Sequence, residues 1–341
     1  MAEREIIVKF KLWIVLIGLA LFSVIRVHAQ EPTETPSPDA VAVSLADADG
    51  VFADVGGVRV YYLDRGPKDG QAVFLLHGFL GSVVDWTNTI PALVEAGYRV
   101  IAFDRPPFGL SDKRTSLDYS TKAMSELTLA LMDVMGIEQA AVIGHSAGGQ
   151  VAADFAVRYP DRVTKLVLVD GAVGITGPDM EQSGDPNPAA GAFGMLANLN
   201  PDNSLAQHLV HSFFNSDFAA ALGNAAYADP TKNDPALMML RMRGIQVPGW
   251  EGGLLAYSRD SLSESNVFDL ESLRSVVLPV LLIWGEADEI VPIGVGERLK
   301  TLFPNVQWVT YPNVGHMPMD EVIEAFNADL VQFLGQPSSV N

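Results

Sequence analysis

The stretch Gly144-His145-Ser146-Ala147-Gly148 decides the fold of this chain, because of what lies on either side of it. Before it, Ala140 to Ile143 is a short apolar run that is typical of a buried strand, and residues 150–159 after it predict a helix. A serine between glycines on a sharp strand-to-helix turn needs a strained backbone, which explains its small neighbours. Such a turn holds the serine hydroxyl out at the C-terminal edge of a sheet, near the positive end of a helix.

Apolar strands alternate with helices on both sides of this turn. The predicted strands are residues 72–76, 99–103, 140–143, 166–169, 280–284 and 306–309, and the predicted helices lie near residues 86–95, 120–135, 150–159, 293–302 and 319–334. Strands that are apolar on both faces and alternate with helices predict a parallel sheet covered on both sides. A hairpin, residues 51–63 with Gly56-Gly57 at its turn, precedes them.

The alternation breaks at Gly171 and resumes at Val280. Residues 172–278 carry helix and loop signals without a strand signal, which predicts a helical lid inserted at the C-terminal edge of the sheet, where open α/β folds bind ligands. Residues 51–171 and 279–336 then form the two parts of the core.

The N-terminal residues are expected to lie outside this fold. Lys9 and Lys11 precede an apolar run, residues 12–25, and Val27-His28-Ala29 suits a signal peptidase. The run is shorter than the roughly 20 residues that span a bilayer. Residues 1–29 are therefore predicted to be a signal peptide, with an uncleaved signal anchor as the alternative, and the protein to be secreted or periplasmic. Residues 30–50, rich in Pro, Thr, Glu and Ser, are predicted to be a disordered linker.

The bulk composition excludes several function classes. The formal charge is −19, from 22 basic and 41 acidic side chains, so nucleic acid and anionic membrane surfaces are poor partners. Stable membrane insertion is expected only if the N-terminal segment stays uncleaved. The chain has no cysteine, which excludes disulfides, a thiol nucleophile and cysteine metal sites.

A serine hydroxyl becomes a good nucleophile only when a base takes its proton, and the base needs a carboxylate to fix its tautomer. His316 lies in a loop just after the last predicted strand, and Asp288 in the loop after residues 280–284. The order Ser146, Asp288, His316 is the chain order of nucleophile, acid and base in proteins that place a serine on such a strand-to-helix turn. Glu286 and Asp170 remain competing acids. The oxyanion hole is expected from the backbone N–H groups of Ala147 and Phe79.

The chain resembles the α/β-hydrolases, in the serine-nucleophile branch that includes esterases, C–C hydrolases and perhydrolases. The motifs that carry the resemblance are His77-Gly78-Phe79, Asp104-Arg105-Pro106-Pro107-Phe108-Gly109-Leu110-Ser111, the turn at Ser146, Gly285-Glu286-Ala287-Asp288 and Gly315-His316. The related dehalogenases and epoxide hydrolases carry Asp where Ser146 stands, which speaks against those activities. Pro107 replaces a common glycine, and Met317 stands where C–C hydrolases usually carry Trp.

These observations predict a serine hydrolase that cleaves a small, largely apolar carboxylic ester through an acyl-enzyme, with no cofactor and no metal. The residues expected at the substrate pocket are His77, His145, Trp250 and Met317. Cleavage of a C–C or amide bond by the same triad, cofactor-free perhydrolysis and a non-catalytic binding protein are the alternatives.

Overall fold

The computed structural model describes residues 36–175, 196–214, 221 and 223–337 of the 341-residue chain. Contacts divide the chain into two units, Met1–Pro36 and Ser37–Asn341, and every helix and strand named below belongs to the second. The predicted signal peptide, residues 1–29, lies outside the described residues. None of the described helices is long and apolar enough to cross a membrane.

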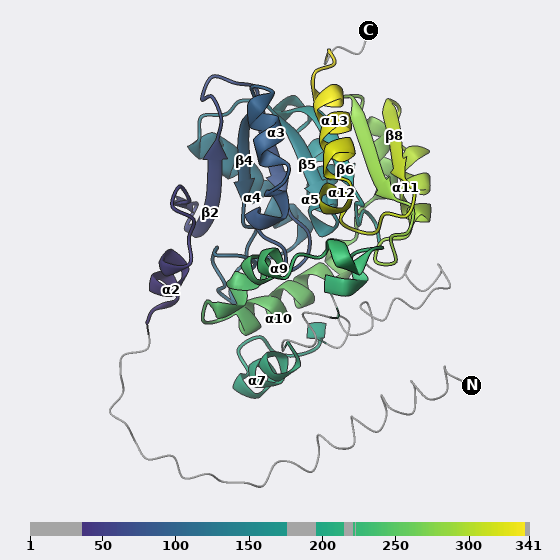
Figure 1. Cartoon of the computed structure of the whole chain (residues 1–341). Helices are drawn as coiled ribbons and strands as arrows, with labels where there is room; N and C mark the ends of the chain where they lie inside the picture. The colour runs from purple at the N-terminus through teal and green to yellow at the C-terminus, as the bar shows by residue number, and fades with distance from the viewer. Residues whose placement is uncertain (1–35, 176–195, 215–220, 222, 338–341) are drawn as a thin grey trace, which may run out of the picture. The chain divides into compact units, whose positions relative to one another are not determined.

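Eight strands form one sheet in the order β1-β2-β4-β3-β5-β6-β7-β8 (Figure 1). Strand β2 runs antiparallel to both β1 and β4, and all the other neighbours are parallel. This mostly parallel sheet confirms the predicted α/β class. The strands are β1 (Val51–Val55), β2 (Val58–Arg65), β3 (Ala72–Leu76), β4 (Arg99–Phe103), β5 (Ala140–His145), β6 (Val163–Val169), β7 (Val280–Gly285) and β8 (Val306–Tyr311).

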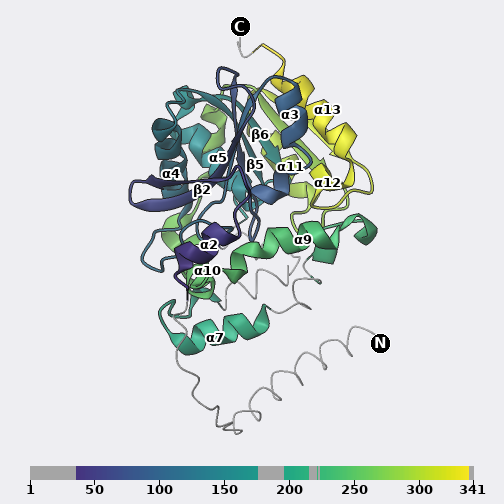
Figure 2. The same cartoon turned by 60° about the vertical axis from the view of Figure 1, so that its left-hand side comes forward.

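Helices cover both faces of the sheet (Figures 1 and 2). One face packs against α4 (Thr121–Val134), α5 (Ala147–Arg158) and α11 (Ile293–Lys300), and the other against α3 (Ile90–Glu95) and α13 (Ile323–Leu334). Within β3, Phe74 and Leu76 belong to the first apolar cluster, while Val73 and Leu75 belong to the second. The continuous apolar run therefore buries both faces of this central strand, as predicted.

Two predicted helices are each divided in the structure. The region around residues 86–95, predicted to be helical, contains the end of a 3-10 turn, η1 (Val83–Trp86), and then α3, with residues 87–89 between them. Near the C-terminus, α12 (Pro318–Glu321) and α13 are separated by Val322, whose φ of −136° and ψ of 53° lie outside the helical region.

The prediction that residues 30–50 form a disordered linker is wrong for residues 38–44, which form helix α2 (Pro38–Ser44). Ser37 caps its first turn, and Ala42 is buried. Asp47, just after it, accepts hydrogen bonds from the Tyr61 hydroxyl (2.6 Å) and from Arg243 (2.7 Å). These partners lie far away in the sequence, so the local composition gave no sign of them.

The segment between β6 and β7 carries helices, and its described residues contain no strand. Helices α7, α9 and α10 lie together beyond one end of the sheet (Figures 1 and 2). The elements among the described residues of this lid are α7 (Ser204–Phe213), η4 (Pro230–Lys232), α9 (Pro235–Arg241), η5 (Met242–Gln246), α10 (Trp250–Ser261), η6 (Glu264–Asn266) and η7 (Leu270–Ser275).

Candidate active site

Ser146 lies on the turn between β5 and α5, with φ 51° and ψ −124°. This positive φ is rare for a residue other than glycine, and such strain persists only where the surroundings hold it. The Ser146 N–H donates to the Val169 carbonyl (3.0 Å), and its own carbonyl accepts from Gly149 (2.8 Å) and Ala172 (2.9 Å). The turn is thus fixed from three sides.

The small residues around Ser146 are required by close backbone contacts. A Cβ on Gly144 would lie 2.4 Å from the Gly148 carbonyl oxygen, and one on Gly148 would lie 2.3 Å from the Leu76 carbonyl oxygen. Both contacts are shorter than real Cβ atoms allow, so the first turn of α5 can pack this tightly against β3 and β5 only without side chains there.

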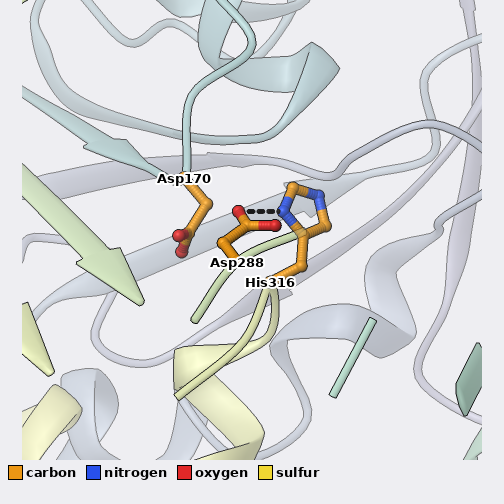
Figure 3. A group of neighbouring side chains, drawn as sticks. All are labelled: Asp170, Asp288 and His316. Carbon is orange, nitrogen blue, oxygen red and sulfur yellow. Dashed lines mark hydrogen bonds and ion pairs between the residues drawn. The ribbon is translucent and has the colours of Figure 1, made fainter. Parts of the chain in front are cut away.

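The loops after β7 and β8 bring Asp288 and His316 together. Oδ2 of Asp288 is 2.7 Å from Nδ1 of His316, and both side chains are buried (Figure 3). The other carboxylate oxygen, Oδ1, accepts the N–H groups of Ile290 (2.7 Å) and Val291 (2.9 Å). The carboxylate therefore has one fixed orientation, with a single oxygen directed at the imidazole.

Asp170 is the third group of this cluster, at the end of β6 (Figure 3). Its Oδ1 accepts the Gly285 N–H (2.9 Å), and its φ is 43°. Burial, followed by the charge of Asp288, raises the pKa of Asp170 well above its usual range. In its protonated form, the Asp170 carboxyl can donate to the Asp288 carboxylate. Glu286, the other competing acid, is exposed and accepts the Thr310 hydroxyl instead.

Asp170, Asp288 and His316 offer ligand atoms that lie within 4.8 Å of one another, a spacing that a metal ion could also use. The contacts in the structure are those of an acid pair joined to an imidazole, because one carboxylate oxygen already bonds Nδ1.

Ser146 follows β5 at the same sheet edge as this cluster, and no hydrogen bond between the described residues joins its Oγ to the His316 imidazole. The connecting residue is His145, whose ring centroid is 4.7 Å from that of His316 and whose Nε2 lies 2.8 Å from the His316 carbonyl oxygen. Serine-to-histidine bonds in ligand-free hydrolases are often long and tighten when substrate binds.

The predicted pocket residues His77 and His145 are both buried, and each has a ring nitrogen close to a main-chain carbonyl oxygen. Burial lowers the pKa of each well below the usual histidine range, with Arg105 adding to the effect at His77 and His316 at His145. Both rings are therefore neutral.

A small cavity of about 20 Å³ is lined by Leu80, which follows Phe79 in the predicted oxyanion loop. Trp250 lines it, whereas His77, His145 and Met317 do not, and Met317 packs into the core under α13. The Phe79 ring contacts Phe108, one of the lining residues, at 5.4 Å between centroids. The lining residues are Leu80, Pro107, Phe108, Gly109, Arg241, Met242, Gly244, Ile245, Trp250 and Leu254.

A buried ion cluster, which no sequence pattern predicts, joins the lid to the core. Arg241, at the end of α9, bonds the carboxylates of Asp85 (3.0 Å) and Asp320 and the hydroxyl of Tyr227 (2.7 Å). Burial alone would lower the pKa of Arg241, but the two carboxylates outweigh it and raise that pKa. Arg241 and Asp85 come from segments 156 residues apart, and no local pattern marks either as buried.

The lid is also joined to the loop that carries His316. The His316 N–H donates to the Ala226 carbonyl (2.8 Å), and the Glu321 carboxylate accepts the N–H groups of Gly315 (2.7 Å) and Asp229 (3.2 Å).

Comparisons with known proteins agree with this architecture. The α/β hydrolase fold family matches residues 71–321. A 2-hydroxy-6-oxononadienedioate/2-hydroxy-6-oxononatrienedioate hydrolase of Paraburkholderia phymatum is 32% identical over 287 residues, which cover 82% of this chain and 92% of the relative. A bifunctional esterase/perhydrolase of Acinetobacter calcoaceticus is 28% identical over 282 residues, covering 82% of this chain and 96% of the relative.

Among solved structures, the meta-cleavage product hydrolase of Pseudomonas fluorescens matches with a TM-score of 0.66 at 26% identity. The match covers 84% of this chain and 97% of that protein. With the family match spanning most of the chain and the named relatives all hydrolases, this protein belongs to the α/β-hydrolase fold family and is a hydrolase.

Proposed function

We propose that this protein is a serine hydrolase that cleaves a small, largely apolar carboxylic ester through Ser146, His316 and Asp288. The observation that carries the proposal is the buried Asp288–His316 pair at the same sheet edge as the strained Ser146 turn. A fixed carboxylate on Nδ1 leaves Nε2 of His316 as the basic nitrogen, which is the arrangement that activates a serine.

In this mechanism, Nε2 of His316 takes the proton from Ser146 Oγ as Oγ attacks the ester carbonyl. The N–H groups of Phe79 and Ala147 bind the oxyanion of the tetrahedral intermediate, and His316 then gives its proton to the leaving alcohol. Water then attacks the acyl-enzyme while His316 takes its proton. The tetrahedral intermediate collapses to release the acid, and His316 gives the proton back to Ser146 Oγ.

The cavity of about 20 Å³ near the oxyanion loop has a largely apolar lining, which supports an uncharged group beside the site. Arg241 is its one charged lining residue among those described, and Asp85 and Asp320 already neutralise this charge. Residues 176–195 of the lid contain no Lys or Arg. A dicarboxylate, such as the one in the name of the Paraburkholderia relative, would find no unpaired cation among these lining residues, whereas an apolar ester needs none.

Cleavage of a C–C bond by the same residues is the second candidate, because several relatives carry that activity in their names. Turnover of p-nitrophenyl esters of rising chain length, compared with turnover of a vinylogous diketone, separates the two. Faster turnover of the diketone would refute the ester assignment but not the serine chemistry. Peracid formation from acetate and peroxide tests perhydrolysis.

Labelling with a fluorophosphonate probe, followed by peptide mapping, tests the nucleophile. We expect label on Ser146 and none on the Ser146→Ala variant. Label on another residue, equal labelling of both proteins, or no labelling of the wild type would refute the proposal, and the last result would favour a binding protein.

We also propose that the protein is exported. The support is the sequence of residues 9–29, with its two lysines, apolar run and small residues before Gln30. A mature protein that begins at Gln30 outside the cytoplasm is the expected result, and a retained residue 1–29 segment would point to a signal anchor.

A further inference from the structure

Arg105 is a buried arginine that the mechanism above does not use. It follows β4, is 1% exposed, and none of the ion pairs between described residues includes it. Its side chain instead donates to two main-chain carbonyls: Nε and Nη2 bond the His77 oxygen (3.0 and 2.7 Å), and Nη2 also lies 3.2 Å from the Gly78 oxygen. Burying a guanidinium without a carboxylate partner is unfavourable, and these carbonyls, together with the Tyr257 side chain, favour the charged form of Arg105.

The Gly78 carbonyl that Arg105 bonds belongs to the peptide that carries the Phe79 N–H. The same oxygen accepts from Nδ1 of His77 (2.8 Å) and from the Gly81 N–H (3.3 Å). In a trans peptide the C=O and N–H point in opposite directions, and the one cis bond among the described residues is Pro106–Pro107. Three donors on the oxygen therefore fix the direction of the Phe79 N–H.

The loop that Arg105 holds lies directly on the Ser146 turn. A Cβ on Gly78 would lie 3.1 Å from Cβ of Ser146 and 3.0 Å from Nδ1 of His145. No side chain therefore separates this part of the loop from the serine, and a small rotation of the Gly78–Phe79 peptide would change where its N–H points relative to Oγ.

His77 completes the contact between the two loops. Its Nε2 accepts the main-chain N–H of Arg105 (2.8 Å), so the ring proton is on Nδ1, which donates to Gly78. Arg105 thus bonds His77 twice, through its main chain to the ring and through its side chain to the carbonyl. The two residues form a closed set of hydrogen bonds around the Gly78 carbonyl.

We infer that Arg105 is a positioning residue for the oxyanion hole. It holds the peptide between Gly78 and Phe79 so that the Phe79 N–H is directed to the side of Ser146. Its positive charge beside the carbonyl polarises the peptide, which makes the Phe79 N–H a stronger hydrogen-bond donor. The inference rests on the proposed serine chemistry, but it holds whether the substrate is an ester or a C–C bonded ketone.

The test compares Arg105→Met and Arg105→Lys with the wild type, and uses Arg243→Met as the matched control. Arg243 is also a buried arginine, but its hydrogen bonds go to Asp47 and the Leu45 carbonyl and not to residues 77–81. The measurements are the rate of fluorophosphonate labelling, the affinity for a trifluoromethyl ketone that forms a serine adduct, and the affinity for the matching methyl ketone, which binds without a stable oxyanion.

Removing a whole oxyanion donor typically lowers the rate about 10²–10³-fold. Because Arg105→Met leaves the N–H present but misdirected, we expect labelling to slow about 10- to 100-fold, with a similar loss of trifluoromethyl ketone affinity and nearly unchanged methyl ketone affinity. The lysine variant should recover part of both, since an ammonium can reach a carbonyl, and Arg243→Met should lower the melting temperature without slowing labelling.

A folded Arg105→Met protein that labels as fast as the wild type, or that loses affinity for both ketones equally, would overturn the inference. If the methionine variant does not fold, the lysine variant decides by the same ratio of ketone affinities. Absence of labelling in the wild type would instead refute the serine chemistry on which the proposed function depends.

Discussion

Replacing Asp288 by asparagine should inactivate the enzyme by trapping His316 in the wrong tautomer. Oδ1 of Asp288 accepts two N–H groups, so an asparagine must place its carbonyl oxygen there. Its NH₂ then faces Nδ1 of His316, at the site of the present 2.7 Å contact. An NH₂ group can only donate, so Nδ1 must be unprotonated and the ring proton moves to Nε2, where it blocks acceptance of the serine proton.

The same change in a serine protease triad lowers kcat about 10⁴-fold, which is about 5 kcal/mol of barrier, and we expect a loss of this order. The assay is steady-state hydrolysis of p-nitrophenyl butyrate, with the rate of fluorophosphonate labelling as a second measure. The loss should fall mainly on kcat, because Asp288 does not line the cavity.

Asp170→Asn is the matched control, because it changes the neighbouring carboxyl. An asparagine keeps the Oδ1 acceptor for Gly285, offers an N–H toward Asp288, and tolerates the φ of 43°. We expect turnover to change by no more than a few-fold. The result that refutes this reasoning is the reverse order, a large loss for Asp170→Asn and a small one for Asp288→Asn, which would make Asp170 the acid of the triad.

Three further substitutions, one of them with a matched control, test the surroundings of the site. Burial raises the pKa of Asp85 to about 6, so near pH 5 the folded state keeps a proton that the unfolded state has lost. The unfolding free energy of Asp85→Asn, relative to the wild type, should therefore rise by about 2 kcal/mol between pH 4 and pH 7, and a flat difference in urea titrations would contradict this. Gly285→Ala should lower the unfolding free energy by about 3 kcal/mol in the same assay and lower turnover, because the new Cβ would lie 2.0 Å from the Gly315 carbonyl oxygen. Its control, Gly294→Ala, should be neutral or slightly stabilising, because a Cβ there would have nothing within 4 Å. Tyr227→Phe removes a hydroxyl that bonds Asp320 and Arg241 at 2.7 Å each, so calorimetry should show a loss of about 1–3 kcal/mol.

The sequence predicted the sheet well, because its strands are apolar runs with clear ends. Strands β3 and β4 begin and end at the predicted residues, 72–76 and 99–103. The hairpin turn was predicted equally well, since Gly56 and Gly57 both have positive φ, 62° and 83°, which a tight hairpin requires. In these places the local signal and the tertiary structure agree.

The buried charges could not be predicted in the same way. Nothing in the local sequence distinguishes Arg105 and Arg241 from exposed arginines, because the partners that accompany their burial come from distant segments. Helix α2 was missed for the same reason, since residue Asp47 beyond its end is held by Tyr61 and Arg243. The sequence likewise leaves Asp170, Glu286 and Asp288 in competition as the acid, and the hydrogen bond to Nδ1 of His316 is what distinguishes Asp288 from the other two.

The contacts of His316 show that the lid and the core together position the catalytic base. Its side chain is oriented by Asp288 from the sheet, but its main-chain N–H is bonded to Ala226 of the lid, and Glu321 bonds the residues on both sides of that junction, Gly315 and Asp229. A displacement of residues 226–229 would therefore remove the main-chain partner of His316 before it changed the Asp288 contact. This part of the lid belongs to the wall that positions the base, and the freedom to admit substrate must come from segments that make no such bonds to the His316 loop.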